Sequence, residues 1–302
     1  MTEPVSVSVV SVPVDGGALA VGVWGPSSGD VPVVLAVHGI TASHLSWAMV
    51  AAALGGEVRL LAPDLRGRGA SSELPGPYGL RSHARDMVAV LDWAGVESAV
   101  VVGHSMGAYV AGVMAESFPE RVQRVVMVDG GLPLPVPAGL SVDQLVEAVI
   151  GPARARLSMT FASREEYRAF WRNHPALAAA WGPEIEAYID YDLVGEAPSF
   201  RSRVSLDAVL GDSEDTLVDE SLRTALSRIT VPIELARAER GMLDEPTPLF
   251  PDALVAAWLE QAPTLVDLGV VPDTNHYTVT MSTHGAAAVA GAIRNAVTQA
   301  EL

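Results

Sequence analysis

Residues 98–115 read Ser-Ala-Val-Val-Val-Gly-His-Ser-Met-Gly-Ala-Tyr-Val-Ala-Gly-Val-Met-Ala. The first part is an apolar, β-branched run, typical of a strand buried on both faces, and the second is rich in small residues, typical of a closely packed helix. The segment 103–107, Gly-His-Ser-Met-Gly, stands at the junction. An abrupt strand-to-helix turn strains the junction residue and lifts its side chain clear of the backbone. We therefore expect Ser105 to present its hydroxyl at the end of a sheet strand.

The neighbours of Ser105 suit a nucleophile. Gly103 and Gly107 fit because a side chain two residues away would strike the adjacent strand or the helix. The helix that begins here directs free N–H groups and the positive end of its dipole toward developing negative charge. Met106 N–H is the natural first oxyanion donor. Gly-x-Ser-x-Gly also arises by chance in a chain with 27 glycines, and the flanking strand and helix are what favour the nucleophile.

Composition restricts the possible partners and cofactors. At 302 residues the chain has room for one large α/β domain, with or without an insertion. The formal charge of −17, from 36 acidic against 19 basic residues, argues against nucleic acid or an anionic membrane as a partner. All the bases are arginine and cysteine is absent, which excludes Schiff-base lysines, cysteine nucleophiles and thiolate metal sites. We expect neither a cofactor nor a metal.

The N-terminal residues also carry a prediction about location. Residues 1–6 have no basic region before an apolar core, and no apolar run approaches the roughly eighteen residues of a membrane span. These features predict a cytoplasmic protein that acts on a small molecule, as a monomer or a homodimer.

Two halves of the chain show the pattern of a parallel sheet. Residues 5–14 and 18–24 predict an antiparallel hairpin around Asp15-Gly16-Gly17, and further strands are expected at 31–37, 58–62, 122–128, 232–237 and 264–269. Helical spacing recurs between them at 45–54, 81–93, 252–261 and 285–297. This alternation predicts an α/β fold with a mostly parallel central sheet of about eight strands, flanked by helices.

The residues between these halves have a different pattern. Residues 132–228 lack strand signals and contain predicted helical segments at 143–149, 163–173, 183–190 and 219–226. We interpret residues 132–228 as a helical cap inserted into a core domain formed by 1–131 and 229–302.

A serine hydroxyl needs a base near neutral pH, and histidine has the suitable pKa. The candidates are His38, His44, His83, His104, His174, His276 and His284. His276 follows the last predicted strand, where it can reach the carboxyl edge of the sheet and Ser105. We therefore favour His276, with His284 as the alternative. We expect structural roles for His38 and His104, and surface or cap positions for His83 and His174.

The base in turn needs a carboxylate to fix its tautomer, and two loops offer one. Asp129 directly follows the strand at 122–128, whereas Glu239 and Asp244 lie in the loop after the strand at 232–237. Both loops lie at the appropriate end of the sheet. The second oxyanion donor should come from residues 38–40, His-Gly-Ile, where Gly39 permits a sharp turn that directs Ile40 N–H toward the site.

The chain at this point resembles the α/β-hydrolase superfamily. The resemblance rests, in order, on residues 38–39, on Pro-Asp-Leu-Arg-Gly-Arg-Gly-Ala-Ser at 63–71, on residues 103–108 and on residues 275–276. It implies an α/β-hydrolase fold with Ser105 as nucleophile, His276 as base, and Ile40 and Met106 as oxyanion donors. Most capped members carry the acid in a Gly-x-x-Asp pattern after the later strand, and here that position falls on Gly241. A minority use an acid after the preceding strand, an arrangement similar to residues 121–129. It favours Asp129, with Asp244 and Glu239 left open.

A serine nucleophile excludes the dehalogenase and epoxide hydrolase chemistries, which need a carboxylate at that position. The sequence then favours hydrolysis of an ester or lactone under a mostly apolar roof of cap aromatics, although any one of these aromatics taken alone is more typical of the core of the cap. These aromatics are Phe161, Tyr167, Phe170, Trp171, Trp181, Tyr188 and Tyr191. The resemblance also leaves open the hydrolysis of a carbon–carbon bond in a diketone-like substrate, and a non-catalytic ligand-binding protein.

Overall fold

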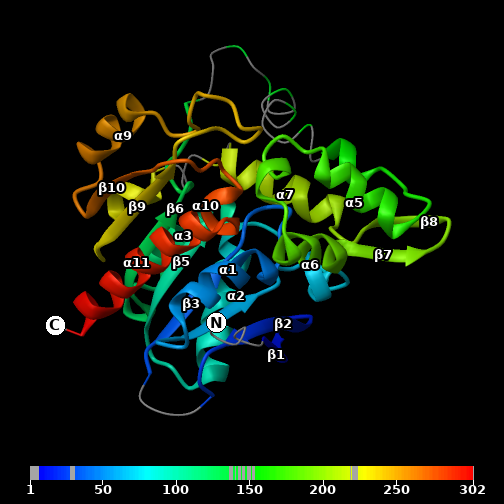
Figure 1. The fold of residues 1–302 in the computed structure, drawn as a ribbon. Coiled ribbons are helices and arrows are strands. Elements are labelled where there is room, and N and C mark those ends of the chain that lie inside the picture. The colour runs from blue at the N-terminus through cyan, green and yellow to red at the C-terminus, as the bar shows by residue number, and fades with distance from the viewer. Residues whose placement is uncertain are drawn as a thin grey trace.

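The centre of the molecule is an eight-stranded sheet in the order β1-β2-β4-β3-β5-β6-β9-β10 (Figure 1). The computed structural model describes residues 7–27, 31–135, 154–217 and 224–301, together with the single residues 139, 141, 144, 147, 151 and 219. The strands of the sheet are β1 (Ser8–Val14), β2 (Gly17–Trp24), β3 (Val33–Val37), β4 (Arg59–Pro63), β5 (Ala99–His104), β6 (Val122–Val128), β9 (Ile233–Ala238) and β10 (Leu265–Val271).

Most of the sheet is parallel. β2 is antiparallel to β1 and to β4, and every other pairing in the sheet is parallel. The hairpin pairs Val14 with Gly17, so Asp15 and Gly16 form a two-residue turn in which Gly16 has a φ of 81°. Both the predicted hairpin and the predicted fold class are confirmed.

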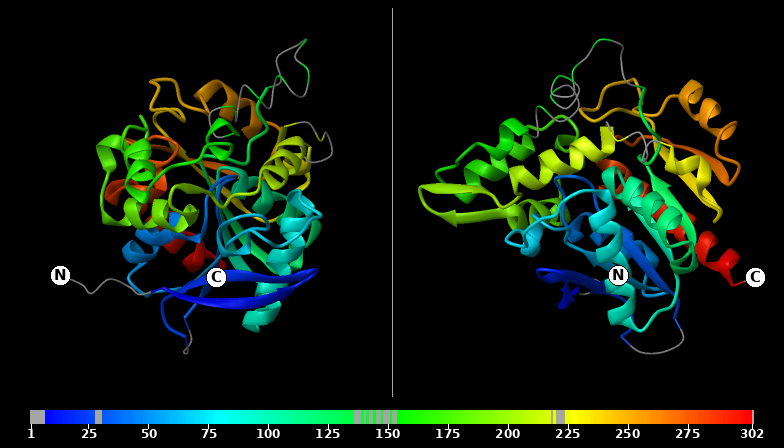
Figure 2. Two further views of the ribbon diagram at one scale, coloured as in Figure 1. Left: turned by 90° about the vertical axis from the view of Figure 1, so that its right-hand side faces the viewer. Right: turned by 180° about the vertical axis from the view of Figure 1, so that it is seen from behind.

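Helices cover both faces of the sheet (Figures 1 and 2). One face packs against α1 (Ala48–Leu54) and α11 (Thr283–Ala300). The other packs against α2 (Leu80–Ala94), α3 (Met106–Ser117) and α9 (Asp252–Leu259). Every residue of β5 is buried, as the apolar run before Ser105 predicts. This double cover excludes water from the strands and leaves their carboxyl ends available for a site.

The described part of the segment between β6 and β9 is mainly helical, and most of it extends to one side of the sheet (Figure 1). Its described α-helices and strands are α5 (Arg164–Arg172), α6 (Pro183–Asp192), β7 (Leu193–Glu196), β8 (Ser199–Ser202) and α7 (Leu206–Leu217). The expectation that this segment has no strands is wrong, because β7 and β8 form an antiparallel hairpin. With four residues each, these strands are too short to show an alternating pattern. The predicted helix at 143–149 lies mostly outside the described residues. Half of the one predicted at 219–226 also does, and its described end enters a short 3-10 helix, Ala225–Arg228.

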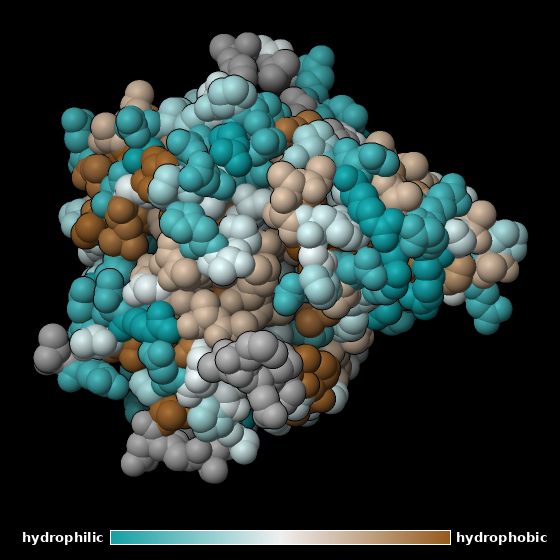
Figure 3. Space-filling model, in the orientation of Figure 1, coloured by the Kyte–Doolittle hydropathy of each residue, from teal (hydrophilic) through white to brown (hydrophobic). Residues whose placement is uncertain are grey.

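The edge strand β10 exposes apolar side chains. Val266, Leu268 and Val270 are 56%, 47% and 41% exposed, and Leu259 of α9 is 41% exposed. β10 and α9 lie at the left of Figure 1, and in the same orientation Figure 3 shows apolar surface on that side, whereas the surface over α5 and α6 at the right is mainly hydrophilic. The expected monomer or homodimer stays a prediction.

None of the described helices combines the length and the apolar character that crossing a bilayer requires.

Candidate active site

Ser105 lies at the carboxyl edge of the sheet, directly after β5, and is the N-cap of α3. Its φ of 56° is in the left-handed region, the strain expected of a tight strand-to-helix turn. A Cβ atom on Gly103 would lie 2.1 Å from the Gly107 carbonyl oxygen, and one on Gly107 would lie 2.0 Å from the Val37 carbonyl oxygen. Both positions therefore require glycine for the reason that the sequence suggests.

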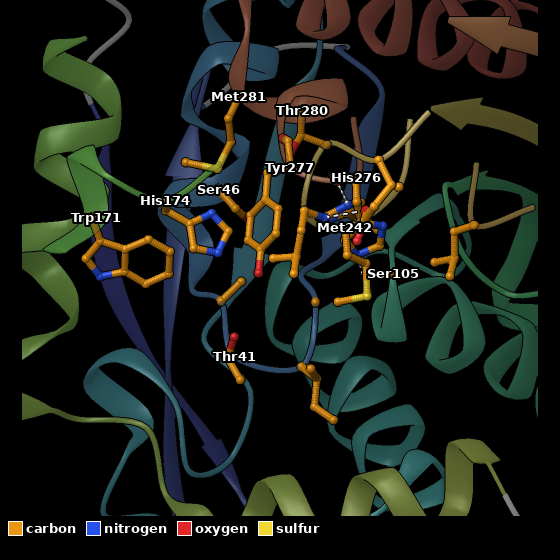
Figure 4. A pocket seen from close by; sticks show the side chains of 18 of the residues that line it. Thr41, Ser46, Ser105, Trp171, His174, Met242, His276, Tyr277, Thr280 and Met281 are labelled. Atoms are coloured by element: carbon orange, nitrogen blue, oxygen red, sulfur yellow. Dashed lines mark hydrogen bonds between the residues drawn. The ribbon is translucent and has the colours of Figure 1, made fainter. Parts of the chain in front are cut away.

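Ser105, His276 and Asp129 form a hydrogen-bonded series. The Ser105 Oγ atom is 3.0 Å from His276 Nε2, and His276 Nδ1 is 2.6 Å from Asp129 Oδ2. Because the carboxylate accepts the Nδ1 proton, Nε2 is left with a lone pair directed at the serine hydroxyl. His276 lies in the loop between β10 and α10 (Thr278–Met281), and Figure 4 shows its ring beside Ser105. The structure thus brings together Ser105, the favoured base His276 and Asp129, the favoured one of the three candidate acids.

The register of the sheet explains why Asp129 is close to His276. Asp129 follows β6, the strand next to β5, and its N–H donates to the Ala236 carbonyl at 2.8 Å. Asp129 Oδ1 accepts a hydrogen bond from Ala238 N–H at 3.0 Å, so each carboxylate oxygen has its own donor. The side chain is fully buried. These contacts hold the carboxylate in a single orientation behind the imidazole.

The other two candidate carboxylates face different partners. Asp244 Oδ1 accepts from Arg240 Nε at 2.6 Å and from Asn275 Nδ2 at 2.9 Å. The hydrogen bond from Asn275, followed in size of effect by the one from Arg240, holds the pKa of Asp244 below its usual range. Glu239 accepts from Asp273 N–H at 2.8 Å. Neither carboxylate is hydrogen-bonded to His276, and Asp244 approaches it only through the neighbouring residue Asn275.

Ile40 and Met106, the expected oxyanion donors, lie near the serine: Ile40 lines the same cavity and Met106 follows Ser105 in the chain, and their role as donors stays a prediction. Met106 is the first residue of α3, so its N–H has no carbonyl one turn earlier in the helix. A Cβ atom on Gly39 would lie only 3.1 Å from Ser105 Cβ, which shows how closely the 39–40 backbone approaches the serine. Arg68 Nε donates to the Ile40 carbonyl at 2.9 Å. An arginine of the 63–71 motif therefore fixes the loop that carries Ile40.

His38 and His104 are buried and hold the backbone of the site. Leu65 N–H donates to His38 Nε2 at 3.0 Å, so the proton lies on Nδ1, 2.7 Å from the Gly39 carbonyl. His104 Nε2 lies 2.7 Å from the His276 carbonyl and donates to it. Burial lowers the pKa of His38 to about 4, and burial together with the charge of His276 lowers the pKa of His104 to about 3. Both rings are therefore neutral at neutral pH.

These two histidines predict how stability depends on pH. In the unfolded chain both rings take up a proton near pH 6.5, whereas in the folded chain they stay neutral to about pH 4 (His38) and about pH 3 (His104). Because the unfolded state binds more protons in this range, the free energy of unfolding should fall from pH 6.5 downward, by about a few kcal/mol for each ring. Urea unfolding at pH 7.5, 6 and 5 measures this slope. His104→Gln should show a shallower slope, and an unchanged one would contradict this explanation.

The remaining histidines have separate environments. His44 is buried, and its Nδ1 atom lies 2.9 Å from Asp64 Oδ1. His83 is also buried and pairs with Asp212 of α7 at 3.0 Å, so its expected surface or cap position is wrong: it lies on α2. His174 lines the cavity next to Ser105, in the segment between β6 and β9. His284 is exposed on α11, away from the serine partners described above.

A cavity of about 630 Å³ opens onto Ser105 and His276. Of the seven aromatics expected to form its roof, Phe170, Trp171 and Tyr188 line it. The others have structural contacts: Phe161 and Tyr167 are buried among the helices, Trp181 packs against Arg172, and Tyr191 donates to Asp64 at 2.6 Å. Residues of the 241–249 loop also line the cavity.

Several residues that line the cavity carry no functional signal in the sequence. Met242, Leu249 and Arg156 line the cavity, and no motif or periodicity around them marks that position. Across the described residues, no cluster of three or more histidine, aspartate or glutamate side chains is arranged to hold a metal ion.

Comparisons with known proteins agree with this architecture. Residues 32–163 match the family described as alpha/beta hydrolase fold. Epoxide hydrolase B of Mycobacterium tuberculosis is 29% identical over 192 residues, which cover 61% of this chain and 52% of that protein. Lipase LipV of the same organism is 34% identical over 129 residues, covering 41% of this chain and 48% of the lipase. The chain thus spans about half the length of these curated relatives, and 30% of some others.

Solved structures show the same fold over nearly the whole chain. The crystal structure of E-2-(acetamidomethylene)succinate hydrolase superposes with a TM-score of 0.77 at 21% sequence identity, covering 97% of this chain and all of that one. A thioesterase domain from the curacin biosynthetic pathway gives a TM-score of 0.74 at 20% identity, covering 96% of this chain and 99% of that domain. Together with the match over residues 32–163 and the eight-stranded sheet, these likenesses show that the chain has the alpha/beta hydrolase fold.

Proposed function

We propose that this protein is a serine hydrolase that cleaves a carboxylic ester or lactone through an acyl-enzyme on Ser105. The observation that carries the proposal is the series of hydrogen bonds from Ser105 through His276 to Asp129, at 3.0 and 2.6 Å. A serine, an imidazole and a buried carboxylate in this order generate a nucleophile at neutral pH. Asp129 orients and stabilises the imidazolium form and keeps its own charge.

The proposed reaction has two halves. Ser105 Oγ attacks the carbonyl carbon as its proton moves to His276 Nε2, and the resulting oxyanion accepts hydrogen bonds from Ile40 and Met106 N–H. The carbon–oxygen bond to the alcohol then breaks, and His276 returns the proton to that oxygen. In the second half, water gives a proton to His276 and attacks the acyl carbon, which releases the acid and restores Ser105.

The surroundings of Ser105 support a small substrate with a largely apolar body. Leu134, Phe170, Met242 and Met281 line the cavity beside the polar site. We assign residues 132–228 as a cap over a core of 1–131 and 229–302, because Phe170 and Trp171 of α5 and Tyr188 of α6 contribute to the cavity wall. The substrate would therefore bind between cap and core.

The relative named epoxide hydrolase B raises a different chemistry. Opening an epoxide through a covalent intermediate calls for a carboxylate nucleophile, and here the residue at the tight turn is Ser105. The intermediate that this site favours is therefore an acyl-enzyme, in which Ser105 Oγ is esterified by the acid part of the substrate. The relative named lipase LipV is compatible with that preference.

Matched substrates test the proposal. We expect the purified protein to hydrolyse p-nitrophenyl butyrate and a small aliphatic lactone, with a burst of p-nitrophenol if deacylation is the slower step. The same preparation should leave an aryl diketone intact. Turnover of the diketone without ester turnover would assign carbon–carbon bond hydrolysis, and ligand binding without any turnover would assign a non-catalytic role.

A further inference from the structure

One part of the cavity wall carries polar side chains that acyl transfer does not use. They are Arg156, His174, Tyr188 and Tyr277. Ring contacts run along this wall: the centroids of His276 and Tyr277 are 5.8 Å apart, those of Tyr277 and His174 5.4 Å, and those of His174 and Trp171 5.3 Å. Figure 4 shows the same order, with Tyr277 and His174 between His276 and Trp171. The wall thus leads away from the reacting serine.

Arg156 is the central group at the far part of this wall. It is only 4% exposed, and its guanidinium carbon lies 4.9 Å from the centroid of the Trp171 ring. Its Nη1 donates to Tyr167 Oη and to Asp192 Oδ2, both at 3.0 Å. Its Nε and Nη2 have no hydrogen-bond partner among the residues that the structure describes. A guanidinium has five N–H donors, so the Nε–Nη2 edge of this buried cation keeps donors for which the described residues offer no acceptor. Because Arg156 lines the cavity, we infer that this edge can meet a ligand there.

The neighbouring polar groups are also donors. Within the described part of the chain, the hydroxyls of Tyr188 and Tyr277 make no hydrogen bond, although Tyr188 is only 5% exposed. His174 Nδ1 accepts from Ala176 N–H at 3.3 Å, which leaves the proton on Nε2. Burial, and to a smaller extent the positive charge of Arg156, lowers the pKa of His174. The ring is therefore a neutral N–H donor. Several hydrogen-bond donors that have no protein acceptor therefore line the same cavity.

Charge decides which ligand group suits these donors. Apart from histidines, the charged side chains on the described cavity wall are Arg156 and Glu245. Glu245 is exposed, and its Oε2 accepts from Leu243 N–H at 2.8 Å. Asp192 pairs with Nη1 of Arg156, so it leaves the Nε–Nη2 edge free. Two parallel N–H groups on such an edge match the two oxygens of a carboxylate.

We propose that Arg156, supported by Tyr188, Tyr277 and His174, binds a carboxylate carried by the substrate. This inference rests on the proposed function, because it assigns a substrate class to the same cavity: an ester or lactone that also bears a free acid group. The apolar residues then contact the body of the substrate, while Arg156 fixes its orientation relative to Ser105.

Two pairs of esters test this subsite. The first pair is p-nitrophenyl hydrogen glutarate and its methyl ester, and the second is 4-acetoxybenzoate and its methyl ester, so the carboxylate lies on the acyl side or on the leaving group. We expect kcat/KM to favour the carboxylate member of at least one pair about ten- to a hundredfold. In Arg156→Met that preference should be lost, and Arg156→Lys should retain only part of it because an ammonium lacks the planar fork.

Matched variants separate the subsite from folding and from general charge. Arg172→Met is the control, since Arg172 lies on α5 and pairs with Glu165 and Glu186 outside the cavity lining. It should keep the preference of the wild type. Because Arg156→Met leaves Asp192 without its cation, the double variant Arg156→Met/Asp192→Asn provides a second test in which no charge is left unpaired.

The outcomes distinguish the two proposals. If the wild type cleaves the neutral esters as well as the carboxylate esters in both pairs, or if the double variant keeps the preference, the carboxylate subsite is wrong and the serine hydrolase stands. If the wild type cleaves none of the four esters, the proposed function itself fails.

Discussion

The Ser105→Ala variant should hydrolyse p-nitrophenyl butyrate about ten thousand times more slowly than the wild type, or more slowly still. Without Oγ there is no atom on which an acyl group can form, and His276 Nε2 loses its partner at 3.0 Å. The loss should appear in kcat, because substrate binding depends on the rest of the cavity. Initial rates over a range of substrate concentrations provide the measurement.

Ser117→Ala is the matched control for this substitution. Ser117 is exposed at the opposite end of α3, so its loss changes the same helix without affecting the cavity. Its rate should equal that of the wild type within experimental error. A Ser105→Ala protein that melts like the wild type and keeps more than about a tenth of its activity would show that another group is the nucleophile.

The Asp129→Asn variant should lower turnover by at least about two orders of magnitude. Asp129 Oδ1 accepts from Ala238 N–H and Oδ2 accepts from His276 Nδ1. An asparagine has a single oxygen. If that oxygen stays on Ala238 N–H, the amide N–H₂ faces His276 Nδ1 and favours the tautomer with its proton on Nε2. That tautomer cannot accept the proton of Ser105.

Asp244→Asn is the control for the acid, and it should change turnover by no more than about a few-fold. Asp244 Oδ1 accepts from Arg240 and Asn275, and an asparagine oxygen can retain those contacts. The comparison uses one activated ester and the pH profile of kcat/KM for both variants. If Asp244→Asn were the damaging substitution and Asp129→Asn were mild, the carboxylate that acts behind His276 would belong to the later loop.

The parts of the site that lie next to strands follow from the sequence. Ser105 and Asp129 each come directly after a buried strand, and parallel strands end at the same edge of a sheet, so their proximity follows from the alternating pattern. His276 needs one further step, because its loop must fold back over that edge. His104 holds the loop in this position, because its Nε2 donates a hydrogen bond to the His276 carbonyl oxygen. His104 is adjacent to Ser105, but no local pattern reveals that link.

The choice between Asp129 and Asp244 needed three-dimensional information. Both residues follow strands that end at the same edge, and each has a positive φ, of 43° for Asp129 and 67° for Asp244. What separates them is the side chain each one meets: His276 for Asp129, and Arg240 with Asn275 for Asp244. Sequence spacing does not determine such contacts, since they depend on the path of the 239–245 loop.

The cavity wall was the least predictable part. Arg156, Tyr188 and Tyr277 come from three distant segments, and only packing brings them to one cavity. Aromatic content predicted an aromatic roof, yet Phe161 and Tyr167 are buried within the helical segment instead. The hairpin β7–β8 and the helix α7 also escaped prediction. In this part of the chain the contacts join elements that are far apart in sequence. Hydrophobic periodicity predicts a local helix or strand, and it does not predict which distant elements pack together.

Covalent labelling of the native protein is the decisive experiment. After reaction with a fluorophosphonate, the intact mass should increase by one adduct. Because the chain has no lysine, trypsin cleaves after arginine, and the adduct should appear on the peptide of residues 86–121 and map by fragmentation to Ser105. Ser105→Ala should remain unlabelled. An unlabelled wild type, or equal labelling of Ser105→Ala, would contradict the assignment of Ser105 as the nucleophile.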